Sequence, residues 1–119
     1  MRYLCVIYDE EAKMGTMSKE EGEAFMGEYF AFTDDIKKSG HYLAGEALQP
    51  VATATTVRVR NGKLSTTDGP FAETKEQLGG YYLINARDLN EAIQIAAKIP
   101  SSKTGSVEVR PVVEFDAPA

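Results

Sequence analysis

The sequence has very few residues that bind metals or form disulfide bonds. Its 119 residues include one cysteine, Cys5, and one histidine, His41. A lone cysteine cannot form an internal disulfide, and this pair alone argues against a zinc site. We therefore expect no metal, no cofactor and a reducing, cytoplasmic setting. Cys5 lies among apolar residues of a predicted strand, so we expect a buried core residue rather than a nucleophile.

Long apolar runs and basic runs are also missing. No apolar stretch approaches the roughly 20 residues that cross a bilayer, and the apolar N-terminus is too short for a signal peptide. The net charge is −5, and no cluster of Lys and Arg interrupts the acidic balance. Such a charge disfavours non-specific binding to nucleic acid or to an anionic membrane. We expect neither partner.

A phosphate-binding glycine loop is absent as well, because Gly79-Gly80 does not lead from a strand into a helix. What the chain does have is the apolar content of an ordinary globular protein, 43%. Its length suits a single domain with one modest core. We expect one domain over residues 1–119, with a frayed tail from about residue 116.

Hydrophobic periodicity and turn residues predict an alternating order of strands and helices. Strands are expected at 2–8, 41–48, 53–60, 63–67, 81–86 and 107–115, and helices at 19–39 and 88–99. Residues 71–76 are expected to form a short helical turn or an ordered loop, and residues 101–106 a polar loop.

Local signals support several of these elements. Ser18 and Glu21 have the spacing of a capping box at the first helix. Asn61-Gly62 predicts a two-residue type I′ turn between the third and fourth strands. Pro111 favours an edge or bulged position for the last strand.

Other signals set expected boundaries and faces. Leu78-Gly79-Gly80 is expected to interrupt regular structure between the turn or loop at 71–76 and the strand at 81–86. The second helix is expected to end before Pro100. Its predicted buried face contains Leu89, Ala92, Ile93, Ala96 and Ile99.

Without the hairpin at 53–67, the order is βαββαβ, which is a ferredoxin-like α+β fold with an inserted β-hairpin. The two helices cover one face of its sheet. Because the strand at 2–8 is apolar on both faces, the second face also needs a cover. We predict a homodimer in which two sheets pack face to face.

Several polar residues are candidates for a site. Glu46, Asp68 and Glu73 are candidate catalytic carboxylates, since two carboxyls in different environments can act as acid and base. Arg110 is a candidate for gripping a ligand carboxylate, and Tyr81 for lining the site.

Each candidate also has a structural alternative. Glu46 can be a solvent-facing strand residue, Asp68 can cap its own turn, and Glu73 can pair with Lys75 or a neighbouring strand. Arg110 can pair with Glu108 or Glu114, and Tyr81 can belong to the core. For His41 we favour an exposed position after the first helix over a proton shuttle.

The stretch from Thr67 to Tyr82, TDGPFAETKEQLGGYY, resembles the signature of bacterial DGPF-domain proteins in the YCII-related family. Residues 52–60 and 107–112 also resemble that family. The resemblance implies a dimeric α+β barrel fold. Some relatives are encoded near extracytoplasmic-function sigma factors.

The wider group includes proteins with a proposed His-Asp pair and a dehydrochlorinase-like activity. Here Glu28 or Tyr29 stands where the resemblance would place the histidine, so the pair is not carried over. Two functions stay open: a cofactor-free lyase or isomerase using acid-base chemistry on a small molecule, or a non-catalytic ligand-binding or regulatory dimer tied to stress response.

Overall fold

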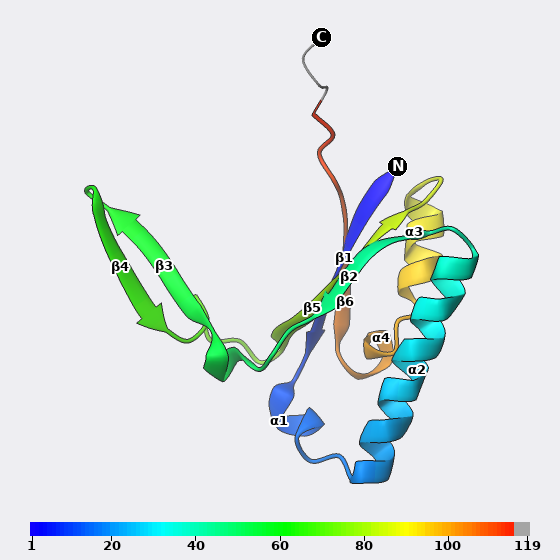
Figure 1. Cartoon of the computed structure of the whole chain (residues 1–119), viewed down its shortest axis with the longest axis horizontal. Helices are drawn as coiled ribbons and strands as arrows, with labels where there is room; N and C mark the ends of the chain where they lie inside the picture. Colours follow the sequence, from blue (N-terminus) through cyan, green and yellow to red (C-terminus); the bar gives the residue numbers. More distant parts are fainter. Residues whose placement is uncertain (116–119) are drawn as a thin grey trace.

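The structure is a computed structural model that describes residues 1–115, so the frayed tail expected from residue 116 lies outside the described residues. Figure 1 shows the chain path. The elements in order are β1 (Arg2–Asp9), α1 (Glu11–Met14), α2 (Lys19–Lys38), β2 (Tyr42–Ala47), η1 (Val51–Thr53), β3 (Thr55–Arg60), β4 (Lys63–Asp68), β5 (Gln77–Asn85), α3 (Leu89–Ala96), α4 (Ser101–Thr104) and β6 (Ser106–Pro111).

Four strands form one antiparallel sheet in the order β2-β5-β1-β6, and β3 and β4 form a separate two-stranded sheet. With the hairpin left out, the central strands β1 and β5 lie between β2 and β6. This is the strand order of a ferredoxin-like fold, as the sequence predicts. The protein is therefore an α+β protein.

The core lies between this sheet and the helices α2 and α3, which cover the same face (Figure 1). Tyr3, Cys5 and Ile7 of β1 are buried against Phe32 and Ile36 of α2. The predicted capping box is confirmed: the Ser18 hydroxyl accepts from the Glu21 N–H, and the Glu21 carboxylate accepts from the Ser18 N–H. It satisfies two backbone donors where α2 begins.

Within residues 1–115, no helix lies over the opposite face of the sheet, which we call the open face. Because side chains alternate along a strand, it carries Leu4, Val6 and Tyr8 of β1. Their partners in register include Tyr81 and Leu83 of β5. All five residues are half-buried in the single chain. The sequence predicts a cover on both faces of the sheet. Within the described chain, the helices cover one face and the open face stays uncovered.

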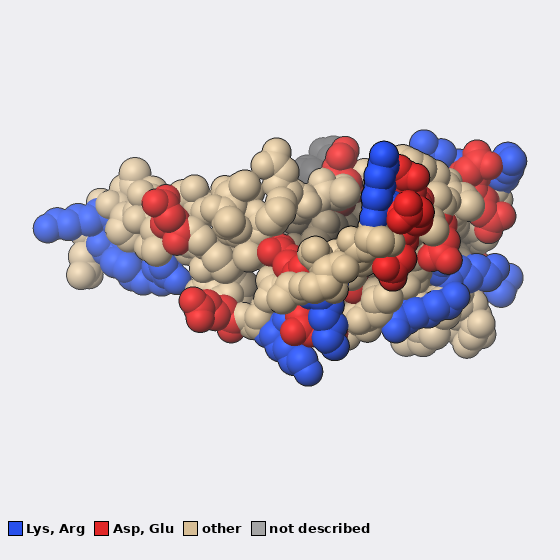
Figure 2. Space-filling view, turned by 90° about the horizontal axis from the view of Figure 1, so that it is seen from below, with Lys and Arg blue, Asp and Glu red and all other residues tan. Residues whose placement is uncertain are grey.

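The inserted hairpin, residues 55–68, projects on the side of the sheet away from the helices, and we call it the arm (Figure 1). Asn61 and Gly62 have φ angles of 52° and 73°, as a type I′ turn requires. Lys and Arg side chains gather on the arm (Figure 2). The predicted turn is confirmed.

The expected break at Leu78-Gly79-Gly80 is wrong, because β5 begins at Gln77. Gly80 pairs with Ile7 and with Ala47, so it belongs to the ladder. Gly79 is the extra residue of a β-bulge, since Ile7 pairs with Gly80 but Tyr8 pairs with Leu78. Residues 71–76 form no helical turn and connect the arm to β5 as irregular chain.

The expected buried face of the second helix is partly wrong. Leu89 and Ile93 are 48% and 46% exposed, whereas Ile95 is buried with Ala92 and Ala96. The side of this short helix that packs on the protein contains Ile95, whereas the apolar pattern predicts a side that contains Leu89 and Ile93. Residues 101–104 form α4 rather than a loop.

The last strand also ends earlier than expected. β6 stops at Pro111, which pairs with Tyr3 near the start of β1, so no strand remains beside residues 113–115. β6 is an edge strand, as Pro111 predicts. Within residues 1–115, no helix has the length and apolar character needed to cross a membrane.

Candidate ligand-binding site

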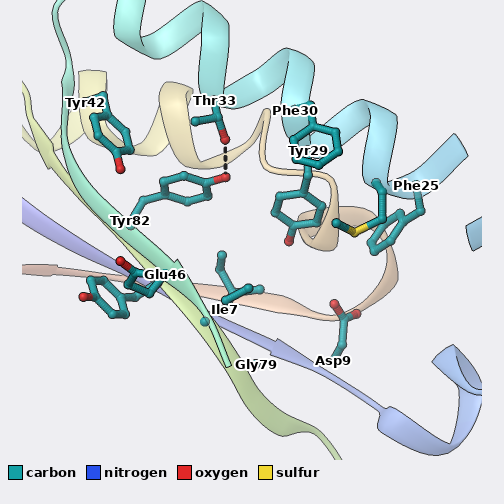
Figure 3. A pocket seen from close by; sticks show the side chains of 15 residues that line it. Ile7, Asp9, Phe25, Tyr29, Phe30, Thr33, Tyr42, Glu46, Gly79 and Tyr82 are labelled. Atoms are coloured by element: carbon teal, nitrogen blue, oxygen red, sulfur yellow. Dashed lines mark hydrogen bonds between the residues drawn. The ribbon is translucent and has the colours of Figure 1, made fainter. Parts of the chain in front are cut away.

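A cavity of about 330 Å³ lies between α2 and the β2 side of the sheet (Figure 3). Three strands and one helix supply its walls. The lining residues are Ile7, Asp9, Phe25, Met26, Tyr29, Phe30, Thr33, Tyr42, Gly45, Glu46, Ala47, Gly79, Gly80, Tyr81 and Tyr82.

The cavity exists because the helix-facing side of the sheet has small residues there. Gly80 and Ala47 are partners in register, and Gly45 pairs with Tyr82. A Cβ on Gly45 would lie 2.7 Å from the Tyr82 ring, and a Cβ on Gly80 would lie 2.7 Å from the Glu46 carbonyl oxygen. A larger residue at either glycine would therefore clash with the neighbouring strand or ring.

Aromatic side chains form most of the wall. The Phe25 and Tyr29 rings meet edge to face at 5.3 Å, and the Tyr42 and Tyr82 rings do so at 6.4 Å. Phe30, at 68% exposure, is one of the exposed apolar lining residues. Such a wall suits an apolar or aromatic small molecule, since ligand sites are mostly apolar with a few placed polar groups.

The main polar group is Asp9, at the end of β1. Its Oδ1 accepts a hydrogen bond from Thr104 Oγ1 at 2.7 Å, and its Oδ2 accepts one from Ser101 Oγ. The Ser101 hydroxyl has one proton and gives it to Asp9, so it accepts its second bond from the Tyr29 hydroxyl. The chain of donors therefore runs from Tyr29 through Ser101 to Asp9.

Two tyrosine hydroxyls lie in the same cavity. Burial raises the pKa of Tyr29 above its usual value, and the negative charge of Asp9 adds to that shift. Burial also raises the pKa of Tyr82, whose hydroxyl is 2.6 Å from Thr33 Oγ1 (Figure 3). Both groups are therefore neutral at pH 7 and can hydrogen-bond to a ligand.

The structure brings two of the five predicted site residues to this cavity. Glu46 of β2 and Tyr81 of β5 are direct partners in register, and both border the cavity, although alternation along the strands places their side chains on the open face. Asp68 ends β4 and Glu73 lies in the following connection; both are exposed, and neither lines the cavity. Arg110 lies on β6, at the other edge of the sheet, where it forms an ion pair with Glu108 at 2.8 Å.

His41 lies outside the cavity. Its Nδ1 is 2.7 Å from Ser39 Oγ, and its Nε2 is 3.3 Å from Glu91 Oε1. The Glu91 carboxylate also accepts from the Arg87 N–H, which is the main reason that the pKa of Glu91 is lowered. These contacts join the end of α2 to the start of α3.

Sequence reasoning missed Asp9, Tyr29 and Ser101. One signal was available for Asp9, which continues the period-two series of Tyr3, Cys5 and Ile7 and so shares their face. Tyr29 lies four residues after Phe25 and three before Phe32, so the sequence marks it as part of an apolar helix face and gives no signal for its hydroxyl. No pattern marked Ser101, because its place opposite Asp9 depends on α4 packing beside β1.

Within residues 1–115, no three side chains of His, Cys, Asp or Glu come together in a way that could hold a metal ion. The candidate site consists of an aromatic-walled cavity with the Asp9 carboxylate and the tyrosines Tyr29, Tyr42 and Tyr82, bordered by Glu46 of β2 and Tyr81 of β5.

Comparison with known proteins agrees with the fold. The family model of the YCII-related domain matches residues 1–116. An uncharacterized protein of Rhizobium meliloti (strain 1021) is 39% identical over 117 residues, which cover 97% of this chain and 94% of that protein. The match extends over the arm, the cavity and the helices α2 and α3. The chain belongs to the YCII-related family.

Proposed function

We propose that the protein binds a small, largely aromatic molecule in the cavity below α2 and acts on it by acid-base chemistry, as a cofactor-free lyase or isomerase. The observation that carries this proposal is the Asp9 carboxylate in an otherwise apolar, aromatic-walled cavity of about 330 Å³. That volume lies within the range of about 300–1,000 Å³ typical of small-molecule sites.

Asp9 is the proposed general base. Thr104 and Ser101 each donate to one of its oxygens, so they fix its orientation while further lone pairs stay available. Asp9 would take a proton from a carbon next to a carbonyl, and the electron pair left behind would move onto the carbonyl oxygen. The proton then returns to a neighbouring carbon in an isomerase, or a leaving group departs in a lyase.

Glu46 stays a proposed second carboxylate and Tyr81 a proposed ligand contact, because both border the cavity, although their side chains lie on the open face. The roles predicted for Asp68, Glu73 and Arg110 need a second copy of the chain, since these residues do not line the cavity of their own chain. They remain proposals that depend on the assembly.

The test is hydrogen exchange on a panel of small aryl ketones in D₂O, followed by proton NMR. We expect the protein to accelerate loss of the α-proton signal of at least one ketone. Asp9→Asn should lower that rate about 10²–10⁴-fold, the usual contribution of a positioned base. Asp35→Asn is the matched control, because Asp35 is exposed on α2.

A rate unchanged in Asp9→Asn would rule out the proposed base. The non-catalytic alternative is favoured by one observation: Ser101 and Thr104 of α4 already engage Asp9, so its carboxylate also ties β1 to α4. If ketones shift the NMR signals of the protein but exchange is absent, the cavity belongs to a binding or regulatory protein. A link to sigma-factor stress response would rest on the family resemblance.

We also propose that the protein is a cytoplasmic homodimer in which two open faces meet. The open face presents Leu4, Val6, Tyr81 and Leu83, and no helix or strand of the described part of the chain covers them. The chain exposes 8483 Å². A folded monomer of 13.0 kDa is expected to expose only about 6,300 Å².

A further inference from the structure

The arm is amphipathic although it stands apart from the body of the protein. Val57 pairs with Thr66 and Val59 with Leu64, so Val57, Val59 and Leu64 share one face. These three side chains are 59%, 58% and 69% exposed. An apolar strand face normally packs on something, and within the described chain this one does not.

The opposite face of the arm is basic. Arg58 pairs with Ser65 and Arg60 with Lys63, which places the three cations together on that side. Residues 55–68 contain three basic residues and one acidic residue, so the arm carries +2, while the rest of the chain carries ten basic and seventeen acidic residues, or −7. The arm is therefore attracted to a body like its own and not repelled by it.

A two-stranded hairpin alone in water is at best marginally stable. Here β3 and β4 form their own sheet and project on the side of the main sheet that lacks helices (Figure 1). The extension is also visible in the size of the chain, whose radius of gyration is 16.6 Å. A compact chain of this length is expected to have about 13.5 Å. The arm therefore has an apolar face that other contacts could cover and a two-stranded sheet that such contacts would stabilise.

We propose that the arm clasps a second copy of this chain, with Val57, Val59 and Leu64 packed on the partner subunit. The exposed area supports this occupant. The excess over a compact monomer is about 2,200 Å², well above the roughly 800 Å² that one partner contributes to a standard interface. A dimer that joins only the two open faces would leave the apolar face of the arm exposed. A dimer in which each arm also packs on the partner subunit would cover the open face and the apolar face of the arm. This inference rests on the self-association proposed above.

The test compares two variants in β4 that add the same charge on opposite faces. Leu64→Asp places it on the apolar face, and Ser65→Asp, the matched control, places it on the basic face beside Arg58. Sedimentation equilibrium of the full chain gives the dimer dissociation constant. We expect Leu64→Asp to raise it at least tenfold and Ser65→Asp to change it less than threefold.

Amide hydrogen exchange separates the arm from the open face. In the wild type, exchange of β3 and β4 amides should slow at least tenfold as the protein concentration rises through the dissociation constant. A dimer whose arm amides exchange at the same rate at all concentrations would overturn the clasp and leave the open-face dimer intact. A chain that stays monomeric would overturn both, while the ligand proposal for the cavity would be unaffected.

Discussion

At the scale of single residues, Ser101 connects more of the site than any charged group does. It is 1% exposed and lies between a carboxylate and a phenol. Its hydroxyl donates to Asp9 and accepts from Tyr29, so the same group holds β1, α2 and α4 together. A serine buried this deeply is justified only because both of its bonds are satisfied.

The first prediction follows from that position. Ser101→Ala should lower the free energy of unfolding by about 1–3 kcal/mol, because Asp9 and Tyr29 both lose a buried partner. Tyr29→Phe should cost less, about 0.5–1.5 kcal/mol, since Ser101 still donates to Asp9. Urea denaturation at pH 7 measures both. Ser102→Ala, next to it in α4, is the control, and equal costs for Ser101→Ala and Tyr29→Phe would contradict the network.

A second residue-scale feature is the missing side chain at Gly45. Any Cβ there would lie 2.7 Å from the Tyr82 ring, which makes an edge-to-face contact with Phe32 at 5.1 Å. Gly79, by contrast, has nothing within 4 Å of a Cβ built on it. We therefore expect alanine to lower the stability of the protein at Gly45 and to change it little at Gly79.

Gly45→Ala should destabilise the protein by about 1–3 kcal/mol, because the Tyr82 ring must move out of a packed position. Gly79→Ala should stay within about 0.5 kcal/mol of the wild type. Thermal unfolding followed by circular dichroism compares the two. A tolerated Gly45→Ala would mean that the ring can shift freely, and the floor of the cavity would then be less defined than the structure describes.

At the scale of elements, α2 has two roles. It supplies one wall of the cavity, and it packs against the buried face of β1. Its start is defined by the capping box of Ser18 and Glu21. Its interior contains Gly22, where an added Cβ meets nothing within 4 Å. One position therefore stabilises the helix and the other weakens it.

Substitutions at these two positions should have opposite signs. Ser18→Ala should lower the free energy of unfolding by about 1 kcal/mol, because the Glu21 N–H loses its acceptor. Gly22→Ala should raise it by about 0.5–1 kcal/mol, because alanine has the higher helix propensity. Urea denaturation gives both values. If both variants shift stability in the same direction, the cap is not what defines the helix start.

At the scale of the whole molecule, the chain has two apolar surfaces that it does not cover itself. One is the open face of the sheet, and the other is the apolar face of the arm. Both lie on the side without helices (Figure 1). The principal extents of the chain, 54 × 47 × 18 Å, describe a flat subunit rather than a sphere. The proposed dimer would cover both surfaces.

The open face has its own test. Leu83 lies beside Leu4 and Ala44 in register at the centre of that face. Leu83→Asp should raise the dimer dissociation constant at least tenfold, because a carboxylate would be buried without a partner. Gln94→Glu, which adds a charge at an exposed position of α3 on the helix side of the sheet, should leave it nearly unchanged. Size-exclusion chromatography over a concentration series measures the dissociation constant. A constant that Leu83→Asp leaves unchanged would exclude this interface.

Much of the fold could be predicted because its signals are local. The Ser18-Glu21 box and the Asn61-Gly62 turn act within four residues of chain, so they form wherever the rest of the chain goes. The signals failed where a distant strand decided the outcome. Gly79 and Gly80 read as a break until β1 and β2 pair beside them, and Leu89 reads as core until the sheet selects another side of α3.

The sequence by itself determined the elements, their order and the family, because periodicity and turn chemistry are properties of neighbouring residues. Only the tertiary structure decided the site. A cavity is space that no side chain fills, and here Gly45 and Gly80 leave that space under α2. Asp9 and Ser101 are 92 positions apart, and they meet because β1 and α4 pack together. No pattern along the chain could contain that contact.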